Sequence, residues 1–153
     1  MDKVLKVIYV DMDGVLCDFI SAYDRDRKLY PEQKYPQSQV GFFLNLEPIK
    51  NAIESFKILE KHFDVWILTR PSVQNPLCYT EKALWVRENL GIDVQRKTIM
   101  ATNKSLLKGD YLIDDVLEHG QSEFEGEHIH FAQEKFPDWN SVVNYIMKKE
   151  NVK

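Results

Sequence analysis

The chain has 153 residues, a formal net charge of −4, 44% hydrophobic residues and 29% charged residues. This balance predicts one globular domain and excludes a disordered or membrane-spanning chain. The acidic charge disfavours a nucleic-acid-binding protein, because neutralising phosphates needs a surplus of Lys and Arg. The first residues lack the apolar segment of a signal peptide, and Cys17 and Cys78 lie too far apart for a metal or redox motif. We therefore expect a cytoplasmic protein with reduced thiols.

The first predicted element is a buried parallel strand over residues 4–10, because the segment VLKVIYV is β-branched and almost wholly apolar. A helix is expected to begin within residues 17–23. Residues 24–40 are polar and contain two prolines, which indicates an irregular insertion or a small cap.

From residue 48 the helical period returns, with apolar residues spaced 3.6 apart up to Leu59. A second strand is predicted over 65–68, and a helix over 81–90 that Gly91 ends. Further strands are predicted over 98–100, 111–113 and 128–131, and a closing helix over 139–147. Strands that alternate with helices predict an α/β, Rossmann-like three-layer fold with a parallel sheet and right-handed crossovers.

Polar residues follow several of the predicted strands. In an open parallel sheet, ligands bind beyond the carboxyl ends of the strands, so we expect these segments to converge on one edge. The residues concerned are Asp11, Asp13, Thr69, Lys104, Asp114 and Asp115.

The carboxylates indicate a metal site. Asp11 and Asp13 are close in sequence, and burying two like charges is costly without a cation. By itself an Asp-x-Asp-Gly segment is more often a turn or a helix cap. Asp114 and Asp115, on another strand, favour the metal site, and a donor set without His or Cys favours Mg²⁺ over Zn²⁺.

The remaining residues suit phosphoryl transfer. Lys104 and Thr69 would hold a phosphoryl group and neutralise its charge. The carboxylate of Asp11 can attack phosphorus and form an aspartyl phosphate, while Asp13 protonates the leaving oxygen and later activates water. Taken singly, this lysine would be a solvated surface residue and this threonine a satisfied strand end. Their shared location is what indicates the chemistry.

The spacing of these residues resembles the four motifs of the haloacid dehalogenase-like (HAD-like) phosphatases. The segments 11–19 (DMDGVLCDF), 41–48 (GFFLNLEP) and 79–91 (YTEKALWVRENLG) are similar to one branch of them, the 5'(3')-deoxyribonucleotidases, also called cytosolic type C 5'-nucleotidases. The resemblance covers nearly the whole chain. It implies a single HAD-like phosphatase domain over 1–153 with a small, reduced cap at about 19–43.

The resemblance also implies a function, the Mg²⁺-dependent dephosphorylation of (deoxy)ribonucleoside monophosphates through an aspartyl phosphate. Asp11 would be the nucleophile and Asp13 the general acid/base. Thr69 and Lys104 would bind phosphate. The metal ligands would be Asp11, Asp13 through its backbone carbonyl, and one or both of Asp114 and Asp115, with Asp115 preferred. Phe19 and Phe43 would line the nucleoside pocket.

Two departures from the family concern selectivity. The cap is shorter than in the vertebrate relatives, and Arg70 stands where a small hydroxyl residue follows the family's threonine. They leave the phosphate chemistry intact and leave open a phosphatase of another small phosphate ester, such as a sugar phosphate. A second alternative is a non-catalytic HAD-fold binding domain, but a binding domain does not need both a nucleophile and a proton shuttle. We expect a monomer or homodimer that acts on a small molecule, with no nucleic-acid polymer and no membrane as partner. His128 and His130 alternate on a strand and are interpreted as structural.

Overall fold

The computed structural model describes residues 4–152. Its centre is a parallel sheet of five strands in the order β3-β2-β1-β4-β5. The strands are β1 (Val7–Val10), β2 (Asp64–Thr69), β3 (Thr98–Met100), β4 (Tyr111–Asp114) and β5 (Glu127–His130). The helices are α1 (Phe19–Leu29), α2 (Ala52–Glu60), α3 (Cys78–Leu90), α4 (Ile92–Arg96) and α5 (Trp139–Lys149), with short 3₁₀ turns at η1 (Pro36–Ser38) and η2 (Lys104–Leu106). The predicted α/β class and parallel sheet are confirmed.

The two faces of the sheet are covered differently. Crossovers from β1 to β2 and from β2 to β3 run in one direction, which places α2 and α3 on the same face. A large core cluster joins Ile8 and Val10 of β1 to Phe56, Trp85 and Trp139 of α2, α3 and α5. Alternation along the strands turns Tyr9 to the opposite face, where a smaller cluster is closed by Phe124 rather than by a long helix.

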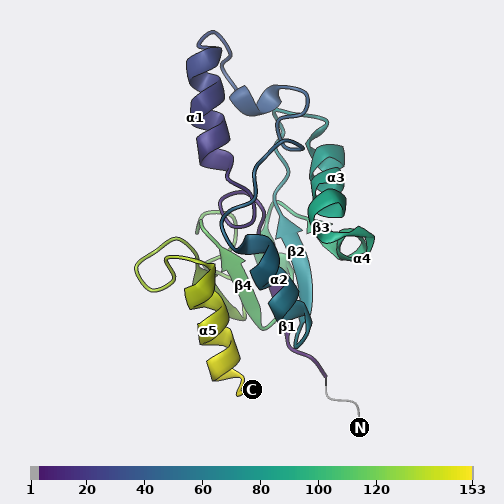
Figure 1. The fold of residues 1–153 in the computed structure, drawn as a ribbon, viewed down its shortest axis with the longest axis vertical. Helices are drawn as coiled ribbons and strands as arrows, with labels where there is room; N and C mark the ends of the chain where they lie inside the picture. The colour runs from purple at the N-terminus through teal and green to yellow at the C-terminus, as the bar shows by residue number, and fades with distance from the viewer. Residues whose placement is uncertain (1–3, 153) are drawn as a thin grey trace.

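Residues 19–47 leave the sheet between β1 and α2, and α1 and η1 lie beyond the carboxyl ends of the strands (Figure 1). This segment is tied to α3 and to the turn before it. The Trp85 indole donates a hydrogen bond to the Leu46 carbonyl at 2.7 Å, and the Asn75 amide donates to the Gln37 and Gln39 carbonyls. The contacts hold the segment above the edge of the sheet where β1 ends.

The structure corrects several predicted boundaries. The first strand begins at Val7 rather than residue 4, because its partner β2 begins at Asp64, opposite Val7. The expectation of an irregular segment from residue 24 is wrong, since α1 continues to Leu29. Its only buried residue is Ala22, so the helix lacks the apolar stripe that would predict it. The helix α4 was not predicted, whereas α3 ends at Gly91 (φ 95°) as predicted.

Side-chain hydrogen bonds cap the N-termini of two helices. Asp18 accepts a hydrogen bond from the Ser21 amide and so caps α1, and Asp138 and Ser141 form a reciprocal capping box on α5. Cys17 and Cys78 are buried and free. Within residues 4–152 we find no helix of sufficient length and hydropathy to cross a bilayer.

Candidate active site at the carboxyl ends of the strands

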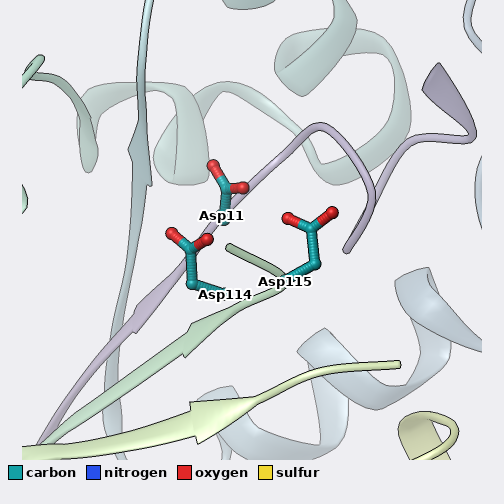
Figure 2. Close-up of side chains that lie close together, drawn as sticks. All are labelled: Asp11, Asp114 and Asp115. Atoms are coloured by element: carbon teal, nitrogen blue, oxygen red, sulfur yellow. The ribbon is translucent and has the colours of Figure 1, made fainter. Parts of the chain in front are cut away.

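Three carboxylates meet where β1 and β4 end. The Asp11 amide donates to the Ile113 carbonyl at 3.0 Å, so the β1–β4 ladder continues to Asp11, while Asp114 is the last residue of β4 and Asp115 follows it. One carboxylate oxygen from each of the three aspartates lies within 4.8 Å of the others. Figure 2 shows the three side chains extending in the same direction from the ends of the strands, so that their carboxylates border a shared space. The sheet thus brings together residues that are about a hundred positions apart in the chain.

These carboxylates carry an excess of negative charge. Burial, and then repulsion from Asp11 and Asp114, raises the pKa of Asp115 to about 7. Burial and repulsion from Asp11 likewise raise the pKa of Asp114. Asp114 and Asp115 therefore resist ionisation, and a cation in the shared space would relieve the cost. The donor set contains only carboxylate oxygens, which fits a hard divalent cation.

A glycine leaves room for Asp115. Gly14 has φ +79°, and a Cβ built on it would lie 2.0 Å from an Asp115 carboxylate oxygen. The turn after β1 therefore requires glycine both for its backbone conformation and for the close approach of the carboxylate.

Lys104 lies against the same carboxylates. Its side chain is 2% exposed, and its ammonium donates to Asp11 Oδ1 at 2.8 Å and to Asp114 Oδ2. Burial lowers the pKa of Lys104, but attraction from Asp11 and Asp114 outweighs burial, so the pKa is raised. An ammonium has a further N–H to donate, and Lys104 reaches the wall of the adjacent cavity.

A second buried lysine, Lys82, holds Asp13. The Lys82 ammonium donates to Asp13 Oδ2 at 2.9 Å, to Thr69 Oγ1 at 2.7 Å and to the Arg70 carbonyl at 2.7 Å, which uses all its donors. Asp13 Oδ1 is buried and has no hydrogen-bond partner among residues 4–152. Burial raises the pKa of Asp13, repulsion from Asp11 adds to this, and Lys82 opposes it.

Lys82 was missed in the sequence although a signal was present. On α3 the residues Cys78, Glu81, Lys82, Trp85 and Val86 share the buried face, so a lysine occupies a position where the helical period predicts an apolar side chain. Such a residue needs a buried partner. The sequence contained the signal but could not identify Asp13 as that partner.

Glu81 on the same face fixes the aromatic segment above the site. Its carboxylate accepts hydrogen bonds from the Gly41 amide at 2.6 Å and the Phe43 amide at 3.0 Å. The Lys82 ammonium lies 5.2 Å from the centre of the Phe43 ring. Phe19 packs beside Phe43, with ring centres 6.2 Å apart.

A cavity of about 290 Å³ opens at this point. Its wall includes Asp11, Asp13, Phe19, Arg70, Lys104 and Asp115. A neighbouring cavity of about 360 Å³ shares Asp13, Phe19 and Arg70 and is also lined by Tyr35 and Phe43. Thr69 lines neither cavity and is fully buried, with its hydroxyl against Lys82.

Three histidines make contacts around the site. The Nε2 atoms of His128 and His130 lie 3.1 Å and 3.0 Å from the carbonyls of Asp114 and Asp115, so these imidazoles donate and hold the backbone of the acidic pair. His119, to which the sequence assigned no role, contacts Arg70 and lines the cavity. Partial burial, and then the nearby positive charge of Arg70, lowers the pKa of His119.

Comparison with known proteins places the chain among hydrolases. Residues 28–144 match the family model described as "5' nucleotidase, deoxy (Pyrimidine), cytosolic type C protein". The chain is 42% identical, over 92% of its length and 84% of the relative's, to a protein of Vibrio phage KVP40 described as a candidate 5'(3')-deoxyribonucleotidase. It is 32% identical to the human cytosolic-type 5'(3')-deoxyribonucleotidase, over 82% of this chain and 79% of the human protein.

A solved structure supports the fold. The candidate HAD-hydrolase YfnB of Bacillus subtilis, bound to magnesium, superposes with a TM-score of 0.59 over 89% of this chain and 90% of that one. The sequence identity is 12%, so this likeness establishes the HAD-like architecture alone.

Proposed function

We propose that the chain removes the phosphate from (deoxy)ribonucleoside monophosphates, because it belongs to the cytosolic type C 5'-nucleotidase family. The chain is thus a phosphoric monoester hydrolase. The observation that carries the proposal is the meeting of Asp11 with Asp114, Asp115 and Lys104 on the wall of one cavity, with Asp13 beside them. The human relative's description as cytosolic supports a cytoplasmic location.

The metal that we propose for this site is Mg²⁺. The carboxylates of Asp11, Asp114 and Asp115, together with the backbone carbonyl of Asp13, would hold it, and the all-oxygen donor set and the raised pKa of Asp115 support this. The ion supplies positive charge that offsets the charge of the phosphate.

Asp11 is the proposed nucleophile. Lys104 engages Asp11 Oδ1, which orients the other oxygen, Oδ2, for attack on phosphorus. The new bond joins Oδ2 to phosphorus while the bond to the leaving ester oxygen breaks, which gives an aspartyl phosphate. Water then attacks the phosphorus of this intermediate, which releases inorganic phosphate and restores the carboxylate.

Asp13 is the proposed general acid and base. Burial raises its pKa, which makes it easier for Asp13 to take up the proton that a general acid donates, and because Lys82 holds Oδ2 we assign that proton to Oδ1. Asp13 gives this proton to the leaving oxygen and later accepts one from the attacking water.

The proposed substrate contacts come from both sides of the cavity. Lys104 binds phosphate through its remaining N–H, and Phe19 and Phe43, in the proposed cap at 19–43, contact the nucleoside. The Thr69 hydroxyl retains a proton to donate, but because it is fully buried, a phosphate reaches it only when neighbouring side chains move.

The test is turnover of dUMP, dTMP, UMP and a sugar phosphate with Mg²⁺ and with excess chelator, in the wild-type protein and in Asp11→Asn. We expect Mg²⁺-dependent release of phosphate that falls by several orders of magnitude in Asp11→Asn, since an amide is a poor nucleophile. The variant should remain folded, because the substitution removes a charge from a repulsive cluster. A variant that keeps more than about a tenth of the wild-type rate would exclude Asp11 as nucleophile.

The same comparison separates the alternatives. A faster sugar phosphate would change the substrate class and leave the catalytic residues as proposed. No turnover of any ester, including p-nitrophenyl phosphate, would favour a non-catalytic binding domain.

A further inference from the structure

A contact between two cavity-lining side chains spans the end of the central strand. Arg70 follows β2, and His119 lies in the segment between β4 and β5. Arg70 Nη1 and His119 Nε2 are 2.6 Å apart. Because β2 and β4 are the two neighbours of β1, this contact crosses the edge of the sheet at which Asp11 is placed. Both side chains line the cavity that contains Asp11.

The contact leaves the charge of Arg70 uncompensated. A guanidinium has only N–H donors, so His119 Nε2 must accept, and the imidazole is neutral with its proton on Nδ1. Within residues 4–152, no carboxylate forms an ion pair with Arg70. The other two cations of the site differ in this respect, since Lys82 is paired with Asp13, and Lys104 with Asp11 and Asp114.

The surroundings hold both residues in place. The His119 amide donates to the buried side chain of Gln121 at 2.6 Å, and the His119 carbonyl accepts from the Lys104 amide at 2.9 Å. The Arg70 carbonyl accepts from the Lys82 ammonium at 2.7 Å. These bonds fix the backbone of both residues, and the contact with His119 orients the guanidinium before any ligand arrives, which reduces the ordering that binding requires.

We propose that Arg70, oriented by His119, binds an anionic oxygen of the substrate. One N–H is used by His119, and the remaining N–H groups of the planar guanidinium match the oxygens of a phosphate. Arg70 lines both cavities, so the anion is either the phosphoryl group that is transferred or a second anionic group on the same molecule. The inference rests on the proposed phosphatase function.

The experiment uses Arg70→Ser and Arg70→Lys in the full chain with Mg²⁺. The substrates are p-nitrophenyl phosphate and dUMP, each with one phosphate, and a deoxyuridine 3',5'-bisphosphate, which adds a second anion. We expect Arg70→Ser to lower kcat/KM by about 10- to 100-fold, the range for a lost hydrogen bond to a charged group. Arg70→Lys should restore part of this loss. Because Arg70 is exposed, the melting temperature should stay near that of the wild type.

The substrates distinguish the two sources of the anion. A similar loss on all three substrates assigns Arg70 to the transferred phosphoryl group. A loss on the bisphosphate alone assigns it to a second anionic group. Values of kcat/KM within about twofold of the wild type on every substrate would overturn the proposal.

Two further variants serve as controls. His119→Phe removes the acceptor that orients Arg70, so we expect a smaller loss than in Arg70→Ser that appears mainly in KM. Arg87→Ser should leave kcat/KM unchanged, because Arg87 is an exposed arginine that donates to the neutral side chain of Gln95 on α4, and it lines neither cavity.

Binding of inorganic phosphate separates this inference from the proposed function. If the wild type hydrolyses none of the esters, the proposed function fails, and calorimetric titration with inorganic phosphate and with the bisphosphate still tests Arg70. A weakening of either Kd by about 10-fold or more in Arg70→Ser supports the anion site. Unchanged Kd values for both ligands would refute it.

Discussion

Burial, and then repulsion from two other carboxylates, makes the negative charge of Asp115 unfavourable. Its pKa is raised from 3.8 to about 7, so the folded protein favours the neutral acid. For a raised carboxyl pKa, the free energy cost to the folded state begins as the pH rises past the unfolded value of 3.8 and is complete above about 7. The metal-free protein therefore loses stability through this group across that window.

Asp115→Asn is accordingly expected to raise the melting temperature of the metal-free protein by a few degrees at pH 8 and to change it little at pH 3.5. Adding Mg²⁺ at pH 8 should stabilise the wild type more than the variant. Thermal melts at both pH values measure these effects. Asp93→Asn, at an exposed side chain, serves as the control. A destabilised Asp115→Asn at pH 8 without metal would contradict the electrostatic account.

Lys82 differs from Asp115 because its charge is favourable. Removing it would leave the carboxylate of Asp13 without its ion-pair partner in a largely buried site. In Lys82→Met the side chain still fills the buried space, but Asp13 loses its ion pair and Thr69 and the Arg70 carbonyl lose a donor. We expect the free energy of unfolding to fall by about 2 kcal/mol, below the range for fully buried pairs because Asp13 is partly exposed.

A double-mutant cycle measures this coupling. Adding Asp13→Asn to Lys82→Met should recover part of the lost free energy of unfolding, because the amide carries no charge to be left unpaired. Denaturant titrations of the wild type, both single variants and the double variant give the coupling energy. Strictly additive effects would mean that Lys82 and Asp13 do not stabilise each other.

At the scale of elements, α3 connects the site to the segment above it. Lys82 points toward Asp13, whereas its neighbour Glu81 accepts two backbone amides from residues 41–43. The helix therefore sets the height of Phe43 above the cavity edge.

Glu81→Gln should loosen this connection, because an amide oxygen is a weaker acceptor than a carboxylate and only one oxygen remains. Amide hydrogen exchange at Gly41 and Phe43 should accelerate. KM for dUMP should rise by about 3- to 10-fold, from the loss of roughly one hydrogen bond's net free energy, while values for p-nitrophenyl phosphate change less. Equal effects on both substrates would argue against a role for this segment in holding the nucleoside.

The elements also show what a single sequence can predict. The segments 65–68, 98–100 and 111–113 lie within β2, β3 and β4, because buried strands are short apolar runs with polar residues at their ends. The same strand ends predicted that Asp11, Asp114 and Asp115 would approach one another, and the geometry agrees. The polar half of α1 carries no such signal, since its residues face solvent.

The site residues that the sequence missed depend on tertiary packing. His119 was assigned no role, and Arg70 was singled out only as a departure from the family; no period or motif predicts that the two meet at 2.6 Å. For Thr69, the position at the end of β2 predicted a phosphate ligand. In the structure its side chain is buried against Lys82 and does not line the cavity. Strand ends thus predict which segments share an edge, and side-chain packing decides which residues reach the cavity.

For the whole molecule, the proposed substrate cavity lies between the edge of the sheet and residues 19–43. Phe19 and Phe43 contribute apolar walls to the adjoining cavities. A 2'-hydroxyl against such walls loses water without gaining a hydrogen-bond partner, which costs about 1–3 kcal/mol.

We therefore expect the catalytic efficiency on dUMP to exceed that on UMP by about ten- to a hundredfold. Steady-state kinetics at matched Mg²⁺ measure this ratio. Phe19→Ser should reduce it, because a hydroxyl in the wall offers the ribose a partner. Equal efficiency on dUMP and UMP in the wild type would rule out selection for the deoxy sugar at these walls.

The pairing of β1 with β4 has a consequence for how the protein folds. Asp11 and Asp114 are 103 residues apart in sequence, and the β1–β4 ladder that brings them together pairs two segments that β2, α3 and β3 separate along the chain. Such non-local pairing slows folding, because the entropy cost of closing a long loop comes before the stabilising contacts form. Here the closing contact also brings like charges together. A divalent cation that neutralises them would act on the refolding rate as well as on the folded state, and a nascent chain cannot build the site until β4 has left the ribosome.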